Sequence, residues 1–340
     1  MSDRPTLRSV ALKAGVSIAT VSKVVNGITT GVSKSTRAQV ENAIRELGYR
    51  PNRSGRSLRV QKHQIIGLAI IDPSPRFLAD PFTTNLVAGL GNQLNVNGFG
   101  LLLYGVMPGT LAETSLMRQS EVDAICLNPS GERKERLATM KLAASLGQPL
   151  IVIQDRDMKS LSDVCFVRQD DIGGAELLAK EVVKRRTCRR AVMVLADIPW
   201  PAVEHRVAGF KKIFDQHGVQ LDFVYCDETS SQAITDGIST YLDRHGPPDV
   251  LVGQNDQIAI IGIHLLTSRG LEVPRDVAVT GYNDFPFTGI SNPVLTTVRS
   301  RAYELGVTAA RAILHRLDTG SFQQREYTLS LDLVQGESAP

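Results

Sequence analysis

A strip of five residues near the N-terminus has the types and spacing that could read the edges of DNA bases. Ile18, Ala19, Ser22, Lys23 and Asn26 occupy positions i, i+1, i+4, i+5 and i+8, which share one face of a helix. A helix that needed only solubility would carry Lys or Glu at the first two positions. Apolar side chains there suit contact with thymine methyl groups, and the lysine suits a guanine edge or a phosphate.

The opposite face of this helix supplies the contacts that would hold it in place. Val21, Val24 and Val25 lie at i, i+3 and i+4, so they form an apolar stripe that can dock on a neighbouring helix despite the low helix propensity of valine. Ile18 has a second interpretation, because it lies three residues before Val21 and could belong to the core. We expect it to face outward.

A helix-turn-helix is the predicted frame around the strip. Thr6 can cap a first helix that runs to Ala14, Gly15 can end it, and Ser17 can cap the second helix. Two short helices with a glycine-containing turn are typical of DNA-binding proteins whose second helix lies in the major groove.

A third helix completes a small all-α unit over residues 1–50. The helix is expected to run from a cap at Ser33 to Leu47, with Val40 and Ile44 facing inward. Three helices of this length can enclose a small apolar core.

Charge is segregated along the chain in a way that fits a polyanionic partner. Residues 1–62 contain 12 Lys and Arg against 3 Asp and Glu, a net +9, whereas the other residues contain 26 against 32, a net −6. A basic head gains affinity for DNA because it neutralises phosphates and releases condensed counterions. Charge alone leaves a solubilising tail as an alternative.

The stretch Tyr49–Lys62, YRPNRSGRSLRVQK, follows the third helix and is open to two interpretations. Pro51 is placed for a helix start, four arginines occur from Arg50 to Arg59, and Leu58 is its main apolar residue. These features fit either a short helix or a plain linker.

From Ile65 onward, apolar runs alternate with amphipathic segments, which predicts parallel α/β layers. The predicted strands are IIGLAII, GLLLY, AICL, PLIVIQ and, after a break, RAVMVLA, FVYC, DVLVG and DVAVTGYND, with helices at about 82–97, 133–146, 171–186, 204–217, 231–245, 255–269 and 303–317. Two successive series predict a body of two α/β lobes. Ligands of open α/β sheets bind beyond the carboxyl ends of the strands.

The common enzyme motifs do not occur in this sequence. A Rossmann dehydrogenase would need glycines at the first βα turn, where IIDPSPRFLADPF has none, and the P-loop, GxSxG and HExxH patterns are missing as well. We therefore expect no enzymatic activity and no cofactor. Cys126, Cys165, Cys188 and Cys226 form no CxxC and have no histidine cluster beside them, so reduced thiols and no metal site are expected.

The gross composition predicts a globular protein of two or three folding units. The chain has 340 residues, of which 42% are apolar, but no run of about 18 apolar residues occurs. The first 15 residues lack the long apolar region of a secretory signal. We expect a cytoplasmic protein with no membrane partner.

Polar or aromatic side chains stand where several predicted strands end. Trp200 follows VMVLA, Asn255 follows VLVG and Asn283 follows VAVTGY, while Arg206 begins the segment RVAGF. Because these ends meet at one edge of each sheet, the four residues are candidate ligand contacts.

Structural roles compete with ligand contact at some of these positions. Asp256 and Asp284 are expected to cap helices, because Asp at a helix start accepts hydrogen bonds from free amide groups. Trp200, between Pro199 and Pro201, could be a packed loop residue or could stack its ring on a ligand.

The N-terminal residues resemble the LacI/GalR family of bacterial transcription regulators. The similarity is carried by TLRSVALKAGVSIATVSKVVNG and then by VSKSTRAQVENAIRELGYRPNRSGRSL, and weaker motifs continue it through the whole chain. It implies double-stranded operator DNA as partner. The expected DNA-contacting residues are Thr6, Ser17, Ile18, Ala19, Thr20, Ser22, Lys23, Asn26, Asn52, Arg53, Gly55 and Leu58.

The resemblance implies that residues 51–62 form a hinge helix on operator DNA. In the family, paired hinge helices of a dimer enter the minor groove, and a leucine, here Leu58, wedges into the central base step. Gly55 stands where family members commonly have alanine, and Ser54 replaces a typical apolar residue. Since glycine costs a helix about 1 kcal/mol relative to alanine, we expect this hinge to order only on DNA.

The body resembles the family's sugar-binding domain, which is similar to periplasmic binding proteins. RVAGF, NDQIA and GYND match the family patterns R-x-x-G-F, N-D-x-x-A and G-[YF]-D-D, and NPVLTTV resembles the crossover between lobes. By this match Arg206 anchors the effector, and Asn255 and Asp155 are pocket positions. Asn283 stands where aspartate is more common, and an amide donates as well as accepts hydrogen bonds. With Arg206 nearby, a sugar, a sugar acid or a sugar phosphate is the expected effector.

The expected protein is a homodimeric DNA-binding repressor under allosteric control. Two-fold symmetry of the dimer maps onto a pseudo-palindromic operator, and the effector shifts the population of two states of the body. The alternative is a cytoplasmic small-molecule-binding or enzymatic α/β protein whose basic head does not bind an operator. The expected organisation is a head at 1–50, a hinge at 51–62 and an effector-binding and dimerisation body at 63–340, with one lobe at about 63–163 and 294–330 and the other at about 164–293.

Overall fold

The structure, a computed structural model, describes residues 5–50, 63–119, 121–156, 158 and 160–339. It divides into two compact units, Met1–His63 and Gln64–Pro340, called here the head and the body. Each unit is described by itself.

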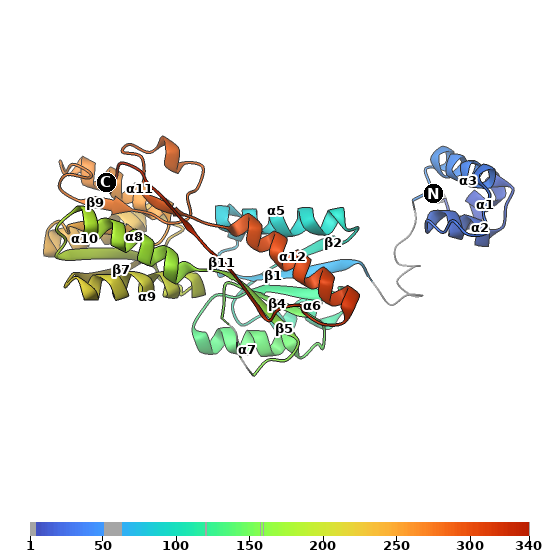
Figure 1. The fold of residues 1–340 in the computed structure, drawn as a ribbon, viewed down its shortest axis with the longest axis horizontal. Helices are drawn as coiled ribbons and strands as arrows, with labels where there is room; N and C mark the ends of the chain where they lie inside the picture. The colour runs from blue at the N-terminus through green and yellow to red at the C-terminus, as the bar shows by residue number, and fades with distance from the viewer. Residues whose placement is uncertain (1–4, 51–62, 120, 157, 159, 340) are drawn as a thin grey trace. The chain divides into compact units, whose positions relative to one another are not determined.

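The head consists of three helices whose ends are set by the capping residues that the sequence contains (Figure 1). Helix α1 (Leu7–Ala14) is capped by Thr6, α2 (Ile18–Val25) by Ser17 and α3 (Lys34–Leu47) by Ser33. Each cap oxygen accepts a hydrogen bond from a backbone N–H in the first turn, which satisfies a group that would otherwise be unpaired. The predicted helix bounds in the head are confirmed.

The head core contains the apolar stripes of all three helices. Its buried members are Val10, Ala11, Val21, Val24, Val40, Ala43 and Tyr49. Val25 is only partly buried, as are Ile44 and Leu47. Ile18 is 49% exposed, so the interpretation that placed it in the core is wrong.

The first lobe of the body is built on a parallel six-stranded sheet with the order β11-β5-β4-β3-β1-β2. Helices α5 and α12 lie side by side on one face, and α6 and α7 cover the other (Figure 1). The bounds are β1 (Ile65–Ile71), β2 (Gly100–Val106), β3 (Ala124–Asn128), β4 (Leu150–Ile153), β5 (Val164–Gln169), β11 (Glu326–Leu329), α5 (Pro81–Val96), α6 (Ser115–Arg118), α7 (Arg133–Ala144) and α12 (Ala302–Thr319), with 3₁₀ turns at Phe77–Ala79 and Leu111–Glu113.

Two glycines allow α5 and α12 to pack at close range. A Cβ added at Gly89 would lie 2.0 Å from the carbonyl oxygen of Tyr303, and one added at Gly306 would lie 2.3 Å from that of Leu86. Because both obstacles are backbone atoms, neither helix could accept a larger residue there without separating.

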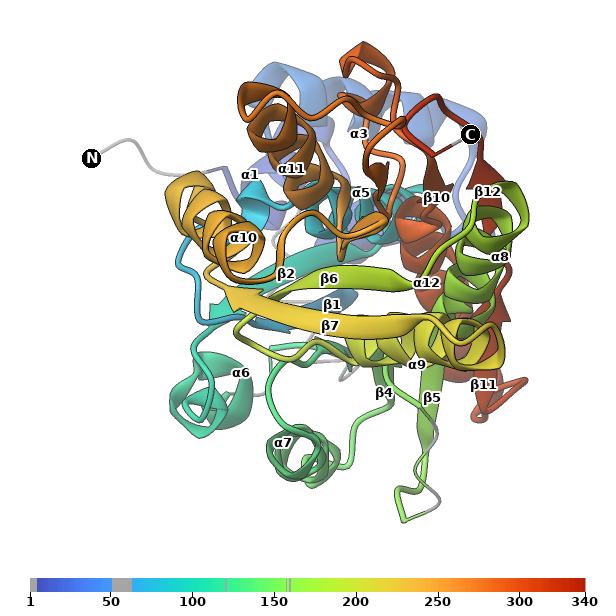
Figure 2. The same ribbon diagram turned by 90° about the vertical axis from the view of Figure 1, so that its left-hand side faces the viewer.

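The second lobe is built on a parallel four-stranded sheet with the order β7-β6-β8-β9. Helices α8 and α9 cover one face and α10 and α11 the other (Figure 2). The bounds are β6 (Arg190–Ala196), β7 (Gln220–Cys226), β8 (Val250–Gly253), β9 (Ala278–Thr280), α8 (Asp171–Arg185), α9 (Pro201–Gln216), α10 (Ser231–His245) and α11 (Asp256–Ser268), followed by a 3₁₀ turn at Thr288–Ile290. An antiparallel pair of short strands, β10 (Thr297–Arg299) and β12 (Asp332–Val334), packs beside it.

The lobe boundaries differ from the expected ones because β5 was not predicted. Val164–Gln169 pairs with both β4 and β11, so this segment belongs to the first lobe, and the second lobe begins with α8. The segment near Thr296 also belongs to the second lobe, since Thr296 forms a bridge with Thr280. Hydrogen bonding between distant strands, rather than chain position, decides both boundaries.

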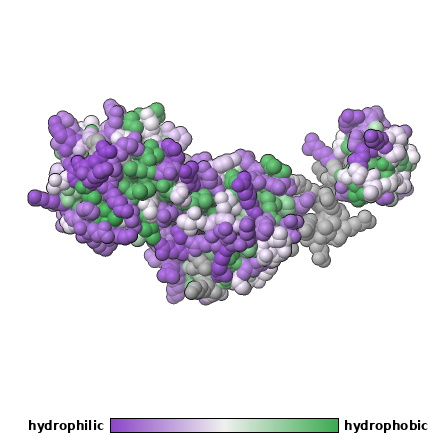
Figure 3. Space-filling model, in the orientation of Figure 1, coloured by the Kyte–Doolittle hydropathy of each residue, from purple (hydrophilic) through white to green (hydrophobic). Residues whose placement is uncertain are grey.

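Among the described helices, none is long and apolar enough to cross a bilayer. In the space-filling view, hydrophilic residues cover much of the visible face of the body, with groups of hydrophobic residues between them (Figure 3).

Candidate functional site

The outer face of α2 presents the strip that the spacing predicts. Ile18, Ala19, Lys23 and Asn26 are exposed, and Ser22 is half-buried. The amide of Asn26 donates to the backbone oxygen of Ser22 at 2.7 Å, which holds the C-terminal end of the strip in place. The helix therefore offers an apolar patch in its first turn and a cation in its last.

The other predicted head contacts have structural duties as well. The hydroxyls of Thr6 and Ser17 cap α1 and α2, and the Thr20 hydroxyl lies 2.9 Å from that of Ser17. These residues mark helix N-termini, where backbone N–H groups can meet phosphates. The predicted contacts at Asn52, Arg53, Gly55 and Leu58 lie outside the described residues.

A pocket of about 670 Å³ lies between the two lobes of the body, at the carboxyl ends of their strands. The first lobe contributes Asp72 after β1, Asn128 at the end of β3 and Gln154 after β4. The second contributes residues that follow β6, β7, β8 and β9. Both lobes can therefore contact a bound molecule at the same time.

Arg206 lies at the base of this pocket, in a buried hydrogen-bond network. Its Nε donates to Asp171 at 2.9 Å, Nη1 to the backbone oxygen of Gln254 at 2.7 Å, and Nη2 to Asn283 at 3.2 Å. The guanidinium lies 3.9 Å from the centre of the Tyr282 ring. Burial raises the pKa of Asp171, and the arginine opposes that rise. The positive charge of Arg206 is thus matched by a carboxylate of its own lobe.

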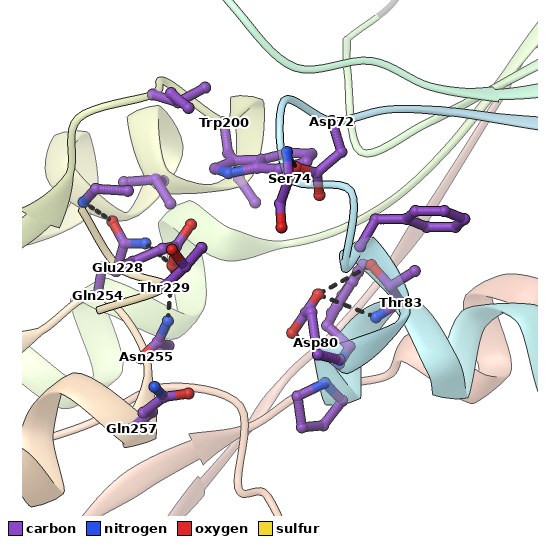
Figure 4. A pocket seen from close by; sticks show the side chains of 18 of the residues that line it. Asp72, Ser74, Asp80, Thr83, Trp200, Glu228, Thr229, Gln254, Asn255 and Gln257 are labelled. Carbon is purple, nitrogen blue, oxygen red and sulfur yellow. Dashed lines mark hydrogen bonds between the residues drawn. The ribbon is translucent and has the colours of Figure 1, made fainter. Parts of the chain in front are cut away.

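Asn255 and Trp200 also line the pocket. Asn255 caps α11 by accepting from the Ile258 N–H at 3.0 Å, and its amide donates to Glu228 at 3.0 Å. Trp200 lies beside Asp72 in the close view of the pocket (Figure 4). The structure therefore brings together four of the five predicted effector contacts: Trp200, Arg206, Asn255 and Asn283.

Asp155 is the exception, and its carboxylate faces a different partner. It accepts from the Nε of Arg136 at 2.8 Å and from the backbone N–H of Arg156 at 2.8 Å, and it does not line the pocket. Its neighbour Gln154, with a φ of 64°, lines the pocket instead. The structure therefore brings Gln154, and not Asp155, to the pocket, because the backbone turns in the left-handed region at Gln154.

The predicted caps at Asp256 and Asp284 are also wrong, since Asn255 caps α11 and no described helix begins at Asp284. Asp256 is fully buried and accepts from the Phe285 N–H at 2.8 Å and the Thr297 hydroxyl at 2.6 Å. Burial raises its pKa to about 6. Asp284 accepts from the Nε of Arg299 at 2.7 Å. Both residues hold loops of the second lobe together.

Arg136 also joins the two lobes through its side chain. It donates two hydrogen bonds of 2.9 Å to the carboxylate of Glu204 on α9, while it keeps its bond to Asp155 in the first lobe. The Gly131 N–H donates to the Pro199 oxygen across the same junction at 2.9 Å. These contacts tie the loops around Trp200 to the first lobe.

Sequence reasoning did not find the acidic residues of the pocket, which are Asp72, Asp80, Asp197, Asp227 and Glu228. The rule that selected Asn255 would also have selected Asp72 and Glu228, because both stand just beyond strands. Asp80 precedes a proline and caps α5 through the N–H groups of Phe82 and Thr83, both at 3.1 Å.

Burial, and for Glu228 and Asp72 also the nearby charge of Asp80, favours the protonated forms of these carboxyl groups. Burial and the charge of Asp80 raise the pKa of Glu228 to about 7. Burial also raises the pKa of Asp72 and of Asp80, with Arg206 opposing the rise at Asp80. Within the described ranges, no group of His, Cys, Asp and Glu is arranged to hold a metal ion.

A helix-turn-helix head joined to a two-lobed body with an interlobe pocket defines the class of ligand-controlled transcription regulators. The model for bacterial regulatory proteins of the lacI family matches residues 6–52, and the model for the periplasmic binding protein-like domain matches residues 181–339. The chain belongs to the LacI family, whose members are DNA-binding transcription regulators and not enzymes.

Relatives match over nearly the whole chain. The HTH-type transcriptional regulator RegA of Clostridium saccharobutylicum is 29% identical over 98% of both chains, and the ribose operon repressor of Bacillus subtilis is 28% identical over 91% of this chain and 90% of its own. A solved complex of the regulator CelR with cellobiose is 27% identical, with a TM-score of 0.71, and covers 98% of this chain and 100% of its own. The lac repressor dimer bound to operator has the same fold, with 24% identity, a TM-score of 0.86 and 99% coverage of both chains.

Proposed function

We propose that this protein is a homodimeric repressor that binds a pseudo-palindromic operator through α2. A single head offers a small contact area, and a two-fold dimer would place two copies of the strip on two half-sites. The exposed residues of the strip support this role, because the core accounts for the valines and leaves Ile18, Ala19 and Lys23 without a structural duty. Residues 51–62, with Leu58, are proposed to enter the minor groove between the half-sites.

The pocket between the lobes is proposed to receive a small hydroxyl-rich effector of the sugar class. The observation that carries this proposal is a pocket of about 670 Å³ whose polar side chains come from both lobes. A ligand that contacts both lobes binds one arrangement of the lobes more tightly than another. The difference between these two affinities sets the allosteric coupling energy. Two similar proteins support the sugar class. CelR has been solved in complex with cellobiose, and a second relative is named a ribose operon repressor.

An acidic effector loses its main support in this arrangement. That expectation depended on Asn283 with Arg206 nearby, but the Arg206 guanidinium is ion-paired with Asp171 at 2.9 Å and also donates to Asn283 at 3.2 Å. A sugar acid or sugar phosphate would also meet the carboxylates of Asp72, Asp80 and Glu228.

Genome-wide immunoprecipitation of the tagged protein from its own cells tests the proposal. Cells would be grown on a series of single carbon sources, with an Ile18→Asp variant of the head as the matched control. We expect a few occupied sites that share a two-fold symmetric motif, with occupancy that changes on one carbon source. Occupancy without a shared motif, or equal occupancy by the control variant, would refute the proposal.

A further inference from the structure

We propose that the effector carries a protonated amine beside its hydroxyl groups, and that Asp72, Asp80 and Glu228 surround this amine. The inference rests on the proposed role of the pocket as the effector site, and it specifies the chemistry of the molecule that the pocket selects.

The three carboxylates come from three elements and face a shared space. Asp72 follows β1, Asp80 begins α5, and Glu228 follows β7 in the other lobe. In the close view, Glu228 lies across the pocket from Asp80, and Asp72 lies beside Trp200 (Figure 4). The negative charge of Asp80 disfavours ionisation of both Asp72 and Glu228, which requires the groups to be near one another.

The cations of the pocket do not balance these charges. Among the described residues, five carboxylates line it, from Asp72, Asp80, Asp197, Asp227 and Glu228, against two guanidinium groups, those of Arg76 and Arg206. Arg206 already has its own counter-charge in Asp171, at 2.9 Å. A positive group on the ligand would relieve the repulsion, a neutral ligand would leave it, and an anion would add to it.

An unpaired amide in the pocket points independently to a polar ligand. Asn128 is 3% exposed and lines the pocket, yet its side chain has no hydrogen-bond partner among the described residues. Its amide atoms are not among the enclosed, unpaired polar atoms of the described residues, so they are open to the pocket, where a hydroxyl or amine of a ligand can bind them.

Hydrogen-bond capacity and aromatic rings complete the site. One oxygen of Asp72 accepts from the Ser74 N–H at 2.7 Å, and the other has no partner in the described part of the chain. Trp200, Phe82 and Phe285 also line the pocket. Aromatic faces attract ammonium groups, and carboxylates accept their N–H bonds, so the combination fits a sugar-like amine better than a plain sugar.

The test uses three pools of probes with matched carbon skeletons: neutral mono- and disaccharides, the corresponding amino sugars, and the corresponding sugar acids. Each is titrated into full-length protein bound to a labelled duplex selected by that protein, and both operator affinity and the melting temperature are recorded. We expect an amino sugar to act at a concentration at least about tenfold lower than its neutral counterpart, and the acid to have no effect.

Two variants separate ligand recognition from structure. Asp72→Asn and Asp80→Asn are each expected to weaken binding of the amino sugar about tenfold or more, because a charge-assisted hydrogen bond is lost. The affinity for the neutral counterpart should change less than about twofold. Asn also caps helices well, so α5 remains capped in the second variant. Asp215→Asn, at an exposed position on α9, is the matched control and is expected to change neither affinity.

The outcomes distinguish the inferred amine on the effector from the proposed role of the pocket as the effector site. If a neutral sugar or a sugar acid acts as tightly as its amino counterpart, or if the two variants weaken neutral and amino sugars equally, the amine inference is overturned while the effector role stands. If no pool changes operator binding, both are overturned.

Discussion

The head and the effector pocket are two binding surfaces of opposite charge and opposite construction. The head carries its cations on a frame of three adjacent helices, and its core comes from residues Val10 to Tyr49. The pocket gathers carboxylates from strand ends between Asp72 and Glu228, and its base is a buried ion pair rather than an apolar core. The head therefore depends on local apolar packing, whereas the pocket depends on charged groups that the fold brings together from distant parts of the chain. Changes that unbalance one surface should leave the other intact.

The largest expected effect is at Asp171. Asp171→Ala leaves the guanidinium of Arg206 buried without its counter-charge, so the free energy of unfolding of the body should fall by about 3–5 kcal/mol. This free energy is measured by urea unfolding, with the fluorescence of Trp200, the single tryptophan of the chain, as the signal. Amide protection in α1 to α3 should stay unchanged. Asp215→Ala is the exposed control, and a loss below about 1 kcal/mol at Asp171 would contradict the buried pair.

Glu228 gives the pocket a dependence on pH that the head should not share. Its pKa is about 7 in the folded protein against an ordinary value of 4.5, so the folded state holds this proton more tightly than the unfolded chain. The contribution of Glu228 to the free energy of unfolding is therefore lost as the pH rises from about 4.5 to about 7, by at most about 3 kcal/mol.

Glu228→Gln should remove that dependence. The variant should match the wild type at pH 4.5 and exceed its free energy of unfolding at pH 8, measured by urea unfolding at both values. Asp227→Asn, at the exposed neighbouring position, is the control. Equal pH dependence of wild type and Glu228→Gln would show that the pKa of Glu228 is not raised in the folded protein.

In the head, two apolar side chains of α2 should separate stability from DNA binding. Val21 is fully buried and Ile18 is 49% exposed. Val21→Ala should cost the head about 2 kcal/mol, and Ile18→Ala less than about 0.5 kcal/mol, as seen by amide exchange of residues 7–47. Ile18→Ala should still weaken operator binding. Similar stability losses at both positions would contradict the assignment of the two faces.

The smallest expected effect is at Lys23. Lys23→Ala should leave the fold unchanged and weaken binding to the selected duplex. If the lysine contacts a phosphate, the slope of log affinity against log salt should shrink by about 1. If it contacts a base, the preference at one position of the site should relax instead. Lys34→Ala, at the exposed start of α3, provides a comparison of equal charge, and identical behaviour of the two variants would contradict a special role for Lys23.

The same contrast explains how much the sequence could predict. The head was predicted to its helix ends, because caps and apolar spacing are local signals. Strand β5 was not predicted because it contains Arg168, and a charged residue is unusual in a buried strand. In the structure the guanidinium of Arg168 donates to the carboxylate of Glu326, 158 positions away, at 2.6 Å. Most of the α/β elements elsewhere in the body were predicted because their apolar runs are long.

The pocket was predicted only where a motif or a strand end marked it. Arg206, Asn255 and Asn283 were found because they stand in such places, and Gln154 and Asp80 were not. Asp155 could not be assigned from sequence, since it lies in the loop after β4 and its partner Arg136 lies on α7. The charge balance of a site depends on which charged residues pair in the folded protein, and such pairs can join residues that are far apart in the sequence.

Selection of bound sequences from a random duplex pool tests whether the protein binds a two-fold symmetric operator through α2. Full-length protein would be used at near-physiological salt, with and without a cell metabolite extract, beside the Ile18→Asp variant. The account predicts enrichment of a two-fold symmetric site by the wild type in at least one of the two conditions and by the variant in neither. The absence of a symmetric site in both conditions, or the same enrichment by the variant, would contradict it.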